Sequence, residues 1–248
     1  MFQFKKFAIK QDRTAMKVGT DGVLLGAWVH LNSNDYRSLD IGSGTGLIAL
    51  MLAQRLHEKL HKSQEEDVKL NDPYIIDAVE IDKDSAEQAT ENIEASQWYK
   101  SVNLHNVSII DFNSSFKYDL IVSNPPFFSD SLLCPDKSRS AARHTVSLTF
   151  DDLIAVVVRL LQPTGRFSLI LPTAESEKFE MTASEQLYLS RRCNIKSRVD
   201  GDAKRVMSEY RMKKTDNIIY EELSIREANS NEYTQEYKKL TSKFYLKF

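Results

Sequence analysis

The amino-acid sequence predicts an α/β protein built on one doubly wound sheet. Short apolar runs alternate along the chain with segments of helical periodicity, which is the pattern of successive strand–helix units. A glycine turn separates the first apolar run from the first helical segment. The chain has 248 residues, of which 42% are apolar, and this is enough for one large domain with a substantial core.

The first half of the sheet is predicted from three strands at 38–41, 74–81 and 102–110. A helix over 47–56 follows the glycine turn, because that stretch has few helix-breaking residues. The second strand leads into another helix with apolar residues along one face. Asp84 and Glu87 have the spacing of a capping box at its start.

The second half is predicted from two strands at 118–123 and 166–171. Between them a helix begins near Thr149 with its apolar side chains on one face, and Gln162–Gly165 ends it. Residues 229–248 are predicted to form a C-terminal helix that packs its aromatic side chains on the core.

The whole chain, 1–248, is expected to be a single domain, with residues 1–37 as an N-terminal extension and 38–248 as the core. The charged stretch 57–73 lacks periodicity and is expected to be a surface loop. No segment has the roughly 18 consecutive apolar residues of a membrane span. The two cysteines lie far apart and form no metal-ligand pattern, so we expect a reduced, cytoplasmic protein without a metal site.

The formal net charge of −2 hides an uneven distribution of charge. Residues 58–94 carry twelve acidic and four basic side chains, whereas residues 189–214 carry nine basic and three acidic ones. Residues 1–20 carry five basic residues and one acidic residue. Each run taken alone is typical of a solvated face, and the two basic segments together are candidates for contact with a polyanion.

The glycine turn contains Gly42, Gly44 and Gly46, which allow the backbone to adopt torsions closed to other residues and to approach a ligand closely. Dinucleotide-binding turns have the longer spacing G-x-G-x-x-G and hold a pyrophosphate. Here Asp40 precedes the turn, and its carboxylate would repel a pyrophosphate but suits an ammonium group. S-adenosylmethionine carries an ammonium group and no phosphate, so it is the expected cofactor.

Acidic residues at the next two strand ends support this cofactor. Glu80 ends the second strand, where a carboxylate can accept hydrogen bonds from both hydroxyls of a ribose. Asp82 beside it is expected to cap the next helix instead. Asp111, after the third strand, is placed to accept from an adenine amine, and Phe112 to lie against the ring; a plain turn is the alternative for Asp111.

The segment Asn124-Pro125-Pro126-Phe127 follows the fourth strand directly. Two prolines fix a rigid, extended backbone there. An exocyclic amine is a poor nucleophile, so it needs to be held with its lone pair toward the methyl carbon. The Asn124 side-chain oxygen and the Pro125 carbonyl oxygen can each accept one N–H, and Phe127 can stack on a planar substrate. The segment therefore predicts methylation of an amino nitrogen.

Together these motifs resemble the class I amino-methyltransferases. The segments Met16–Trp28 and Arg139–His144 narrow the resemblance to the bacterial valine-tRNA adenine-N6 methyltransferase family, over most of the chain. The resemblance implies a Rossmann-like, seven-stranded, mostly parallel sheet with helices on both faces, and tRNA as the substrate of a monomeric enzyme. It also implies that the N-terminal extension, with Gly19 and Asp21, lies over the cofactor pocket, and that Arg139 and Arg143 lie on the RNA side.

Four cations of the basic segment are expected to bind RNA phosphates: Arg192, Arg198, Lys204 and Arg205. Three other functions stay open at this point. They are methylation of a guanine N2 in ribosomal RNA, methylation of a glutamine N5 in a release factor, and RNA binding by a fold that has lost catalysis. A nicotinamide oxidoreductase is disfavoured by the glycine spacing.

Overall fold

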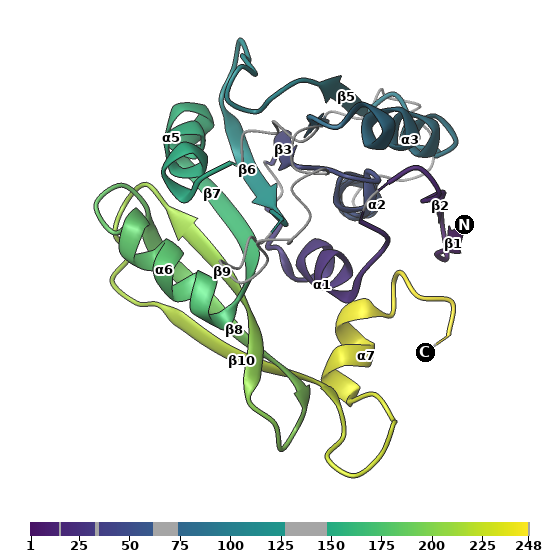
Figure 1. Ribbon diagram of the computed structural model, residues 1–248, viewed down its shortest axis with the longest axis vertical. Coiled ribbons are helices and arrows are strands. Elements are labelled where there is room, and N and C mark those ends of the chain that lie inside the picture. Colours follow the sequence, from purple (N-terminus) through teal and green to yellow (C-terminus); the bar gives the residue numbers. More distant parts are fainter. Residues whose placement is uncertain (15, 33–34, 62–73, 127–147, 248) are drawn as a thin grey trace, which may run out of the picture.

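The computed structural model describes residues 1–14, 16–32, 35–61, 74–126 and 148–247 (Figure 1). Its helices are α1 (Thr20–Trp28), α2 (Leu47–His61), α3 (Lys83–Glu94), α5 (Phe150–Leu160), α6 (Thr173–Ala183) and α7 (Gln235–Thr241). Its strands are β1 (Phe2–Gln3), β2 (Ala8–Ile9), β3 (Arg37–Ile41), β4 (Ile75–Glu80), β5 (Val102–Asn106), β6 (Tyr118–Ser123), β7 (Leu161–Pro172), β8 (Tyr188–Arg198), β9 (Ala203–Arg211) and β10 (Ile219–Arg226).

Eight of these strands form one sheet in the order β10-β8-β9-β7-β6-β3-β4-β5. Strand β9 runs antiparallel to both of its neighbours, and the other neighbouring pairs are parallel. The predicted doubly wound, mostly parallel α/β sheet is therefore confirmed. The sheet has one strand more than the seven expected, because β10 pairs with β8 and extends the edge.

Alternating side chains of the strands pack into two separate cores, one on each face of the sheet. In β6, Leu120 and Val122 join the core under α1, α2 and α7, whereas Ile121 joins the core under α5 and α6. Figure 1 shows these two helical layers on opposite sides of the strands. Continuously apolar strands such as β6 are typical of parallel sheets, because both of their faces are buried.

Several element boundaries differ from the predicted ones for local reasons. Helix α3 is capped by Asp82, whose carboxylate accepts from the Ser85 amide at 2.8 Å, so the predicted capping box at 84 and 87 was wrong. The third strand ends at residue 106, before a turn in which the Ser108 carbonyl accepts hydrogen bonds from the amides of Asp111 and Phe112. The predicted loop from residue 57 was wrong up to His61, where α2 still continues; residues 62–73 lie outside the described ranges.

Helices α1 and α2 approach closely through two glycines of α1. A Cβ atom at Gly22 would lie 3.2 Å from the Leu47 side chain, and one at Gly26 would lie 2.8 Å from the Met51 sulfur. The four-residue spacing of Gly22 and Gly26 puts both on one face of α1. This face fixes α1 against α2, which itself starts directly after the glycine turn.

The two ends of the chain pack on the same helical layer. The backbone of residues 10–13 is held by side chains of α3: Asn92 accepts from the Lys10 amide at 2.8 Å, and Gln88 accepts from the two amides at 12 and 13. The predicted C-terminal helix is confirmed over the shorter range of α7, with Tyr237 and Phe244 buried against the core. The N-terminal segment and α7 thus lie beside α1 and α2 (Figure 1).

Candidate active site

The sheet brings the predicted site residues to one edge. Strands β3, β4, β6 and β7 are mutually parallel, so their carboxyl ends meet there. Strand β9 runs the other way, and its Arg205 lies opposite Pro172, the last residue of β7. The start of β9 and the end of β8 therefore share this edge as well. Ligands of open α/β sheets bind at the carboxyl ends of the strands, and this edge is the candidate active site.

The glycine turn has the backbone that its sequence predicts. Gly42, Gly44 and Gly46 have φ angles of 71°, 54° and 78°, in the left-handed region that favours glycine. Apart from the glycine itself and its two chain neighbours, no atom of the described residues lies within 4 Å of a Cβ built at Gly42 or Gly44. Open space next to a turn with these torsions lets a ligand approach the backbone.

Glu80 connects the end of β4 to this turn. Its buried carboxylate accepts from the Gly44 amide at 2.8 Å and from the Asp82 amide at 2.9 Å. Each oxygen thus uses one lone pair to hold the backbone and keeps another for a further donor. The two hydrogen bonds fix the carboxylate beside the glycine turn.

Asp40 is fully buried at the end of β3. Its Oδ2 accepts from the Ala49 amide of α2 at 3.0 Å, while its Oδ1 has no hydrogen-bond partner within the described ranges. Burial raises the pKa of Asp40 to about 7, the Ala49 hydrogen bond opposes this rise, and the Glu80 carboxylate adds to it. A buried acceptor without a partner costs free energy, and a cationic donor would offset that cost.

The third strand end differs from its prediction in one residue. Asp111 is exposed at the edge, in a turn closed by the Ser108 carbonyl. Phe112, however, is buried with its ring centroid 5.0 Å from that of His105, and it belongs to the core under α5. Its ring lies in that core instead of standing free for a ligand.

Two apolar side chains that the sequence analysis missed stand exposed at the same strand ends. Ile81, directly after Glu80, is 49% exposed, and Ile110, directly before Asp111, is 44% exposed. Exposed isoleucines next to two carboxylates at strand ends offer apolar surface to a flat ring. Their signal in the sequence was an isoleucine next to each acidic residue, directly after β4 in one case and in the turn that follows β5 in the other.

The Asn124 segment follows β6 on the other side of β3. Asn124 is half-buried, and its Oδ1 is buried without a hydrogen-bond partner in the part of the chain that the structure describes. Pro125 is buried and Pro126 is exposed. The Asn124 amide nitrogen lies 3.9 Å from a Cβ built at Gly22, so α1 packs next to this side chain. Phe127, Arg139 and Arg143 lie outside the described residues.

Gly19 and Asp21 lie at the start of α1. Gly19 occupies the N-cap position and provides no side-chain cap. The Asp21 carboxylate accepts from Arg205 Nε of β9 at 2.8 Å. Two residues predicted for different ligands, one for the cofactor and one for RNA, are therefore paired with each other.

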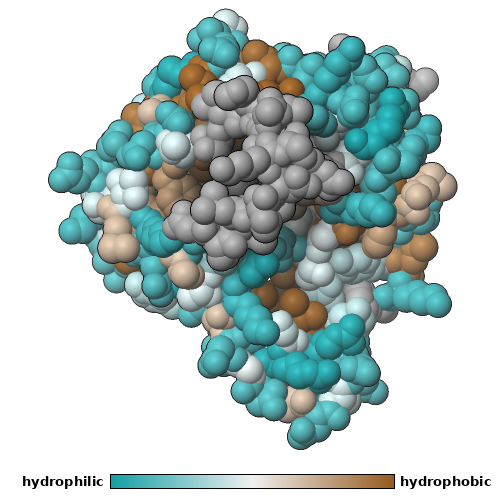
Figure 2. Space-filling view, in the orientation of Figure 1, coloured by the Kyte–Doolittle hydropathy of each residue, from teal (hydrophilic) through white to brown (hydrophobic). Residues whose placement is uncertain are grey.

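The other predicted RNA-binding cations divide by place and by partner. Arg192 lies within β8, away from its carboxyl end, and pairs with Glu180 of α6 at 3.0 Å. Arg198 ends β8 and donates to the carbonyls of residues 227 and 230 and to the Asn231 side chain. Lys204 is exposed at the start of β9, and its ammonium has no ion-pair partner among the described residues. Figure 2 shows hydrophilic side chains at the lower end of the view, where the β8–β9 turn and the loop after β10 lie.

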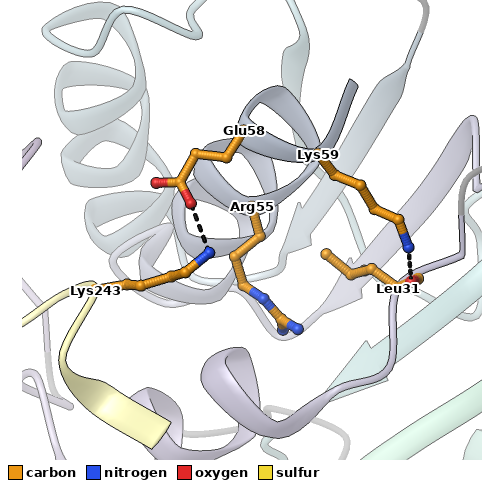
Figure 3. Close-up of a pocket in the computed structure, with 5 residues that line it drawn as sticks. All are labelled: Leu31, Arg55, Glu58, Lys59 and Lys243. Carbon is orange, nitrogen blue, oxygen red and sulfur yellow. Dashed lines mark hydrogen bonds and ion pairs between the residues drawn. The ribbon is translucent and has the colours of Figure 1, made fainter. Parts of the chain in front are cut away.

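A cavity elsewhere in the molecule is lined by Leu31, Arg55, Glu58, Lys59 and Lys243 (Figure 3). Its cations are used within the fold: Lys243 pairs with Glu58 at 2.8 Å, Lys59 donates to the Leu31 carbonyl, and Arg55 donates to a carbonyl of α1 at 2.7 Å. The cavity lies toward the carboxyl end of α2, opposite the glycine turn. Because these cations are engaged within the fold at the far end of α2, the cavity is separate from the candidate active site.

In the described ranges, no group of three or more His, Cys, Asp or Glu side chains could hold a metal ion. No helix in those ranges combines the length and the apolar character needed to cross a membrane.

The fold and the site define the class of the protein, a methyltransferase. The family model for the methyltransferase small domain matches residues 23–183. A solved structure described as a predicted O-methyltransferase from Agrobacterium tumefaciens shares the fold, with a TM-score of 0.65 at 15% identity. The match covers 90% of this chain and 96% of that one.

Two curated relatives narrow the class. The chain is 43% identical to a tRNA1(Val) (adenine(37)-N6)-methyltransferase from Bacteroides thetaiotaomicron, over 99% of this chain and 97% of the relative. It is 40% identical to a protein of the same description from Flavobacterium johnsoniae, over 100% of both chains. The chain belongs to the family of tRNA1(Val) (adenine(37)-N6)-methyltransferases, as the resemblance in its sequence predicts.

Proposed function

We propose that this enzyme transfers a methyl group from S-adenosylmethionine to N6 of adenine 37 in valine tRNA. The substrate follows from the relatives, which carry that description over nearly the whole length of the chain. The observation that carries the chemistry is the Oδ1 of Asn124, which is buried without a partner among the described residues and lies at the strand edge that also holds the glycine turn. An acceptor without a partner is what an exocyclic amine requires.

The residues of the glycine turn fit the cofactor. When bound, S-adenosylmethionine supplies a methyl group activated by a sulfonium. The Oδ1 of Asp40, which has no partner in the described ranges, would accept from its ammonium group, and the second lone pairs of Glu80 would accept from its ribose hydroxyls. Ile81 and Ile110 would contact its adenine ring, with Asp111 accepting from the amine, and contact of Phe112 with that ring stays a prediction.

Asn124 and Pro125 would hold the substrate amine. The Asn124 Oδ1 accepts one N–H and the Pro125 carbonyl accepts the other, which favours a tetrahedral nitrogen with its lone pair toward the methyl carbon. No base is needed before the attack, and the amine loses its proton to solvent afterwards. Pro126 keeps the backbone rigid, and Phe127 remains the expected stacking surface for the base.

The RNA would approach over the start of β9, where Lys204 is exposed. A base in an anticodon loop costs less to extrude than a base paired in a duplex, so the loop suits an enzyme of this size. Arg139 and Arg143 stay assigned to the RNA side by resemblance. We also propose that residues 1–37 cover the cofactor pocket and that the enzyme acts as a monomer.

A nucleoside digest tests this function. The purified protein is incubated with labelled cofactor and either unmodified valine tRNA, ribosomal RNA or a release factor. We expect N6-methyladenosine in valine tRNA alone. N2-methylguanosine in ribosomal RNA, or methylglutamine in the release factor, would overturn the assignment in favour of that rival. Cofactor binding with no product on any substrate would favour the non-catalytic RNA-binding alternative.

A further inference from the structure

Helix α1 starts without the usual stabilising contact. Its N-cap residue is Gly19, which has no side chain to accept from the first free amides. The hydrogen bond that closes the first turn, from the Val23 amide to the Gly19 carbonyl, is long at 3.4 Å. The beginning of α1 therefore depends on contacts from outside the helix to stay in place.

This first turn of α1 contacts both parts of the candidate active site. A Cβ built at Gly22 would lie 3.2 Å from the side chain of Leu47, the first residue of α2 after the glycine turn, and 3.9 Å from the amide nitrogen of Asn124, so this face of α1 borders both side chains. A shift of α1 by a fraction of an ångström would change the room left for the Asn124 side chain. Among the described residues, no group donates a hydrogen bond to the Asn124 Oδ1, so that atom does not hold the side chain in place there.

Arg205 supplies one such contact, in addition to the packing of α1 on α2. It comes from β9, 184 residues away in the chain, and its Nε donates to Asp21 in the first turn of α1 at 2.8 Å. Its backbone is fixed in the sheet, opposite Pro172 of β7 and next to the buried Val206. A rigid strand thus holds the otherwise uncapped end of α1.

We propose that Arg205 is a positioning residue. Through its ion pair with Asp21 it holds the first turn of α1 beside Asn124, and so fixes the direction in which the lone pair of the substrate amine points. This rests on the proposed function, since Asn124 is the residue that receives the amine. It reassigns both partners, because Arg205 then acts on the rate of transfer instead of on RNA affinity, and Asp21 acts through Arg205 instead of on the cofactor.

A double-mutant cycle with Arg205→Gln, Asp21→Asn and the double variant tests the pair. Lys196→Gln is the matched control, because it removes an ion pair of similar exposure, to Glu222, that joins β8 to β10 and does not involve α1. For each variant we would measure kcat and KM on tRNA, cofactor affinity by calorimetry, and hydrogen exchange of a peptide covering α1. Arg205→Lys, which keeps the charge, serves if Arg205→Gln does not fold.

The proposal expects kcat to fall roughly tenfold in both single variants and no further in the double variant, because coupled residues are not additive. KM for tRNA and cofactor affinity stay within about twofold, and the start of α1 exchanges about two- to fivefold faster, as loss of a partly exposed pair allows. Arg205→Lys restores part of the kcat. Lys196→Gln changes none of these quantities.

Other results overturn the proposal. A raised KM for tRNA in Arg205→Gln alone would make it a phosphate contact, and weaker cofactor binding in Asp21→Asn alone would make that residue a cofactor ligand. Unchanged exchange at α1 would also refute positioning, whatever the substrate. If the wild-type enzyme methylates no tRNA, the proposed function fails, and the exchange data still decide whether Arg205 holds α1.

Discussion

The two halves of the strand edge differ in how their predicted residues are engaged. Around β3, β4 and β6, the predicted acceptors Asp40 and Asn124 each keep a buried oxygen without a partner in the described ranges. Around β8 and β9, the predicted arginines already have partners: Arg192 in α6, Arg198 in the loop after β10, and Arg205 in α1. The first half is prepared for a ligand, while the second is largely occupied in holding the fold together.

The difference shows which strand-end motifs predict a functional site from the sequence alone. A turn with glycines, or an Asn followed by prolines, determines its own backbone, so its functional atoms are set by nearby residues. An arginine in a basic segment has no such constraint, and a carboxylate far away in the sequence can bind it. The most informative experiments therefore compare variants from the two halves.

The largest effect is expected in the first half, at Asn124. Replacing Asn124 by Ala removes the acceptor that positions the amine, so kcat should fall on the order of a hundredfold or more while cofactor affinity stays nearly unchanged. Single-turnover methylation of valine tRNA measures the loss. Asn103→Ala is the control. The exposed Asn103 side chain, near the start of β5, donates to Asp77 of β4, and its removal should leave the rate intact. If Asn124→Ala turned over at the wild-type rate, Asn124 would not position the amine, and the proposed difference between the two halves of the strand edge would be lost.

A smaller effect is expected for the cofactor at Glu80. Its replacement by Ala deletes charge-assisted hydrogen bonds to the ribose, worth about 1.5–3 kcal/mol each, and releases the Gly44 amide, so affinity should weaken at least tenfold. Calorimetry with S-adenosylhomocysteine provides the measurement. Asp82→Ala, two residues along, removes only the α3 cap and should cost about 1 kcal/mol of stability without weakening binding. Equal losses of affinity in both variants would point to a general disturbance of the turn.

Asp40 should make cofactor binding depend on pH. Burial raises the pKa of this carboxyl to about 7, so below pH 7 it is mainly protonated and cannot attract an ammonium group. Binding of the ammonium form then requires loss of a proton, and affinity should fall about 25-fold between pH 7.5 and pH 5.5. Asp40→Asn should bind the cofactor weakly at both pH values, and its affinity should hardly change with pH. A wild-type affinity independent of pH in this range would contradict the role.

Sequence reasoning predicted the local features of this molecule and missed those that depend on distant residues. The fold class, the glycine turn and the cap of α3 by Asp82 follow from neighbouring residues. The residue pattern did not place β8, β9 or β10, and the seven strands implied by the resemblance left out one of them. Strand β10 has an interrupted apolar pattern on an edge of the sheet, which predicts little by itself. Phe112 packs in the core under α5, because an aromatic residue after a strand can pack inward as well as face a ligand, and its contact with the cofactor ring stays a prediction.

The pairing of α1 had a signal that was not used. The four-residue spacing of Gly22 and Gly26 indicates a close helix contact, and it was present in the sequence. The pairing of Asp21 with Arg205 had no comparable signal, because 184 residues separate them. Contacts of this kind follow from the topology of the sheet, which places the start of β9 beside α1.

The smallest expected effect concerns RNA affinity and compares two cations of the second half. Lys204 is exposed at the strand edge of the active site, whereas Arg192 lies within β8 and is paired with Glu180. Replacing Lys204 by Gln should raise KM for tRNA a few-fold and lower the slope of log affinity against log salt by about 1, because one phosphate contact is lost. Arg192→Gln should leave that slope unchanged, since its guanidinium already has a carboxylate partner. Fluorescence anisotropy of labelled tRNA at several salt concentrations measures both slopes. If the two variants lost equal slope, the RNA path would extend down β8, and ion pairing within the fold would no longer separate binding cations from structural ones.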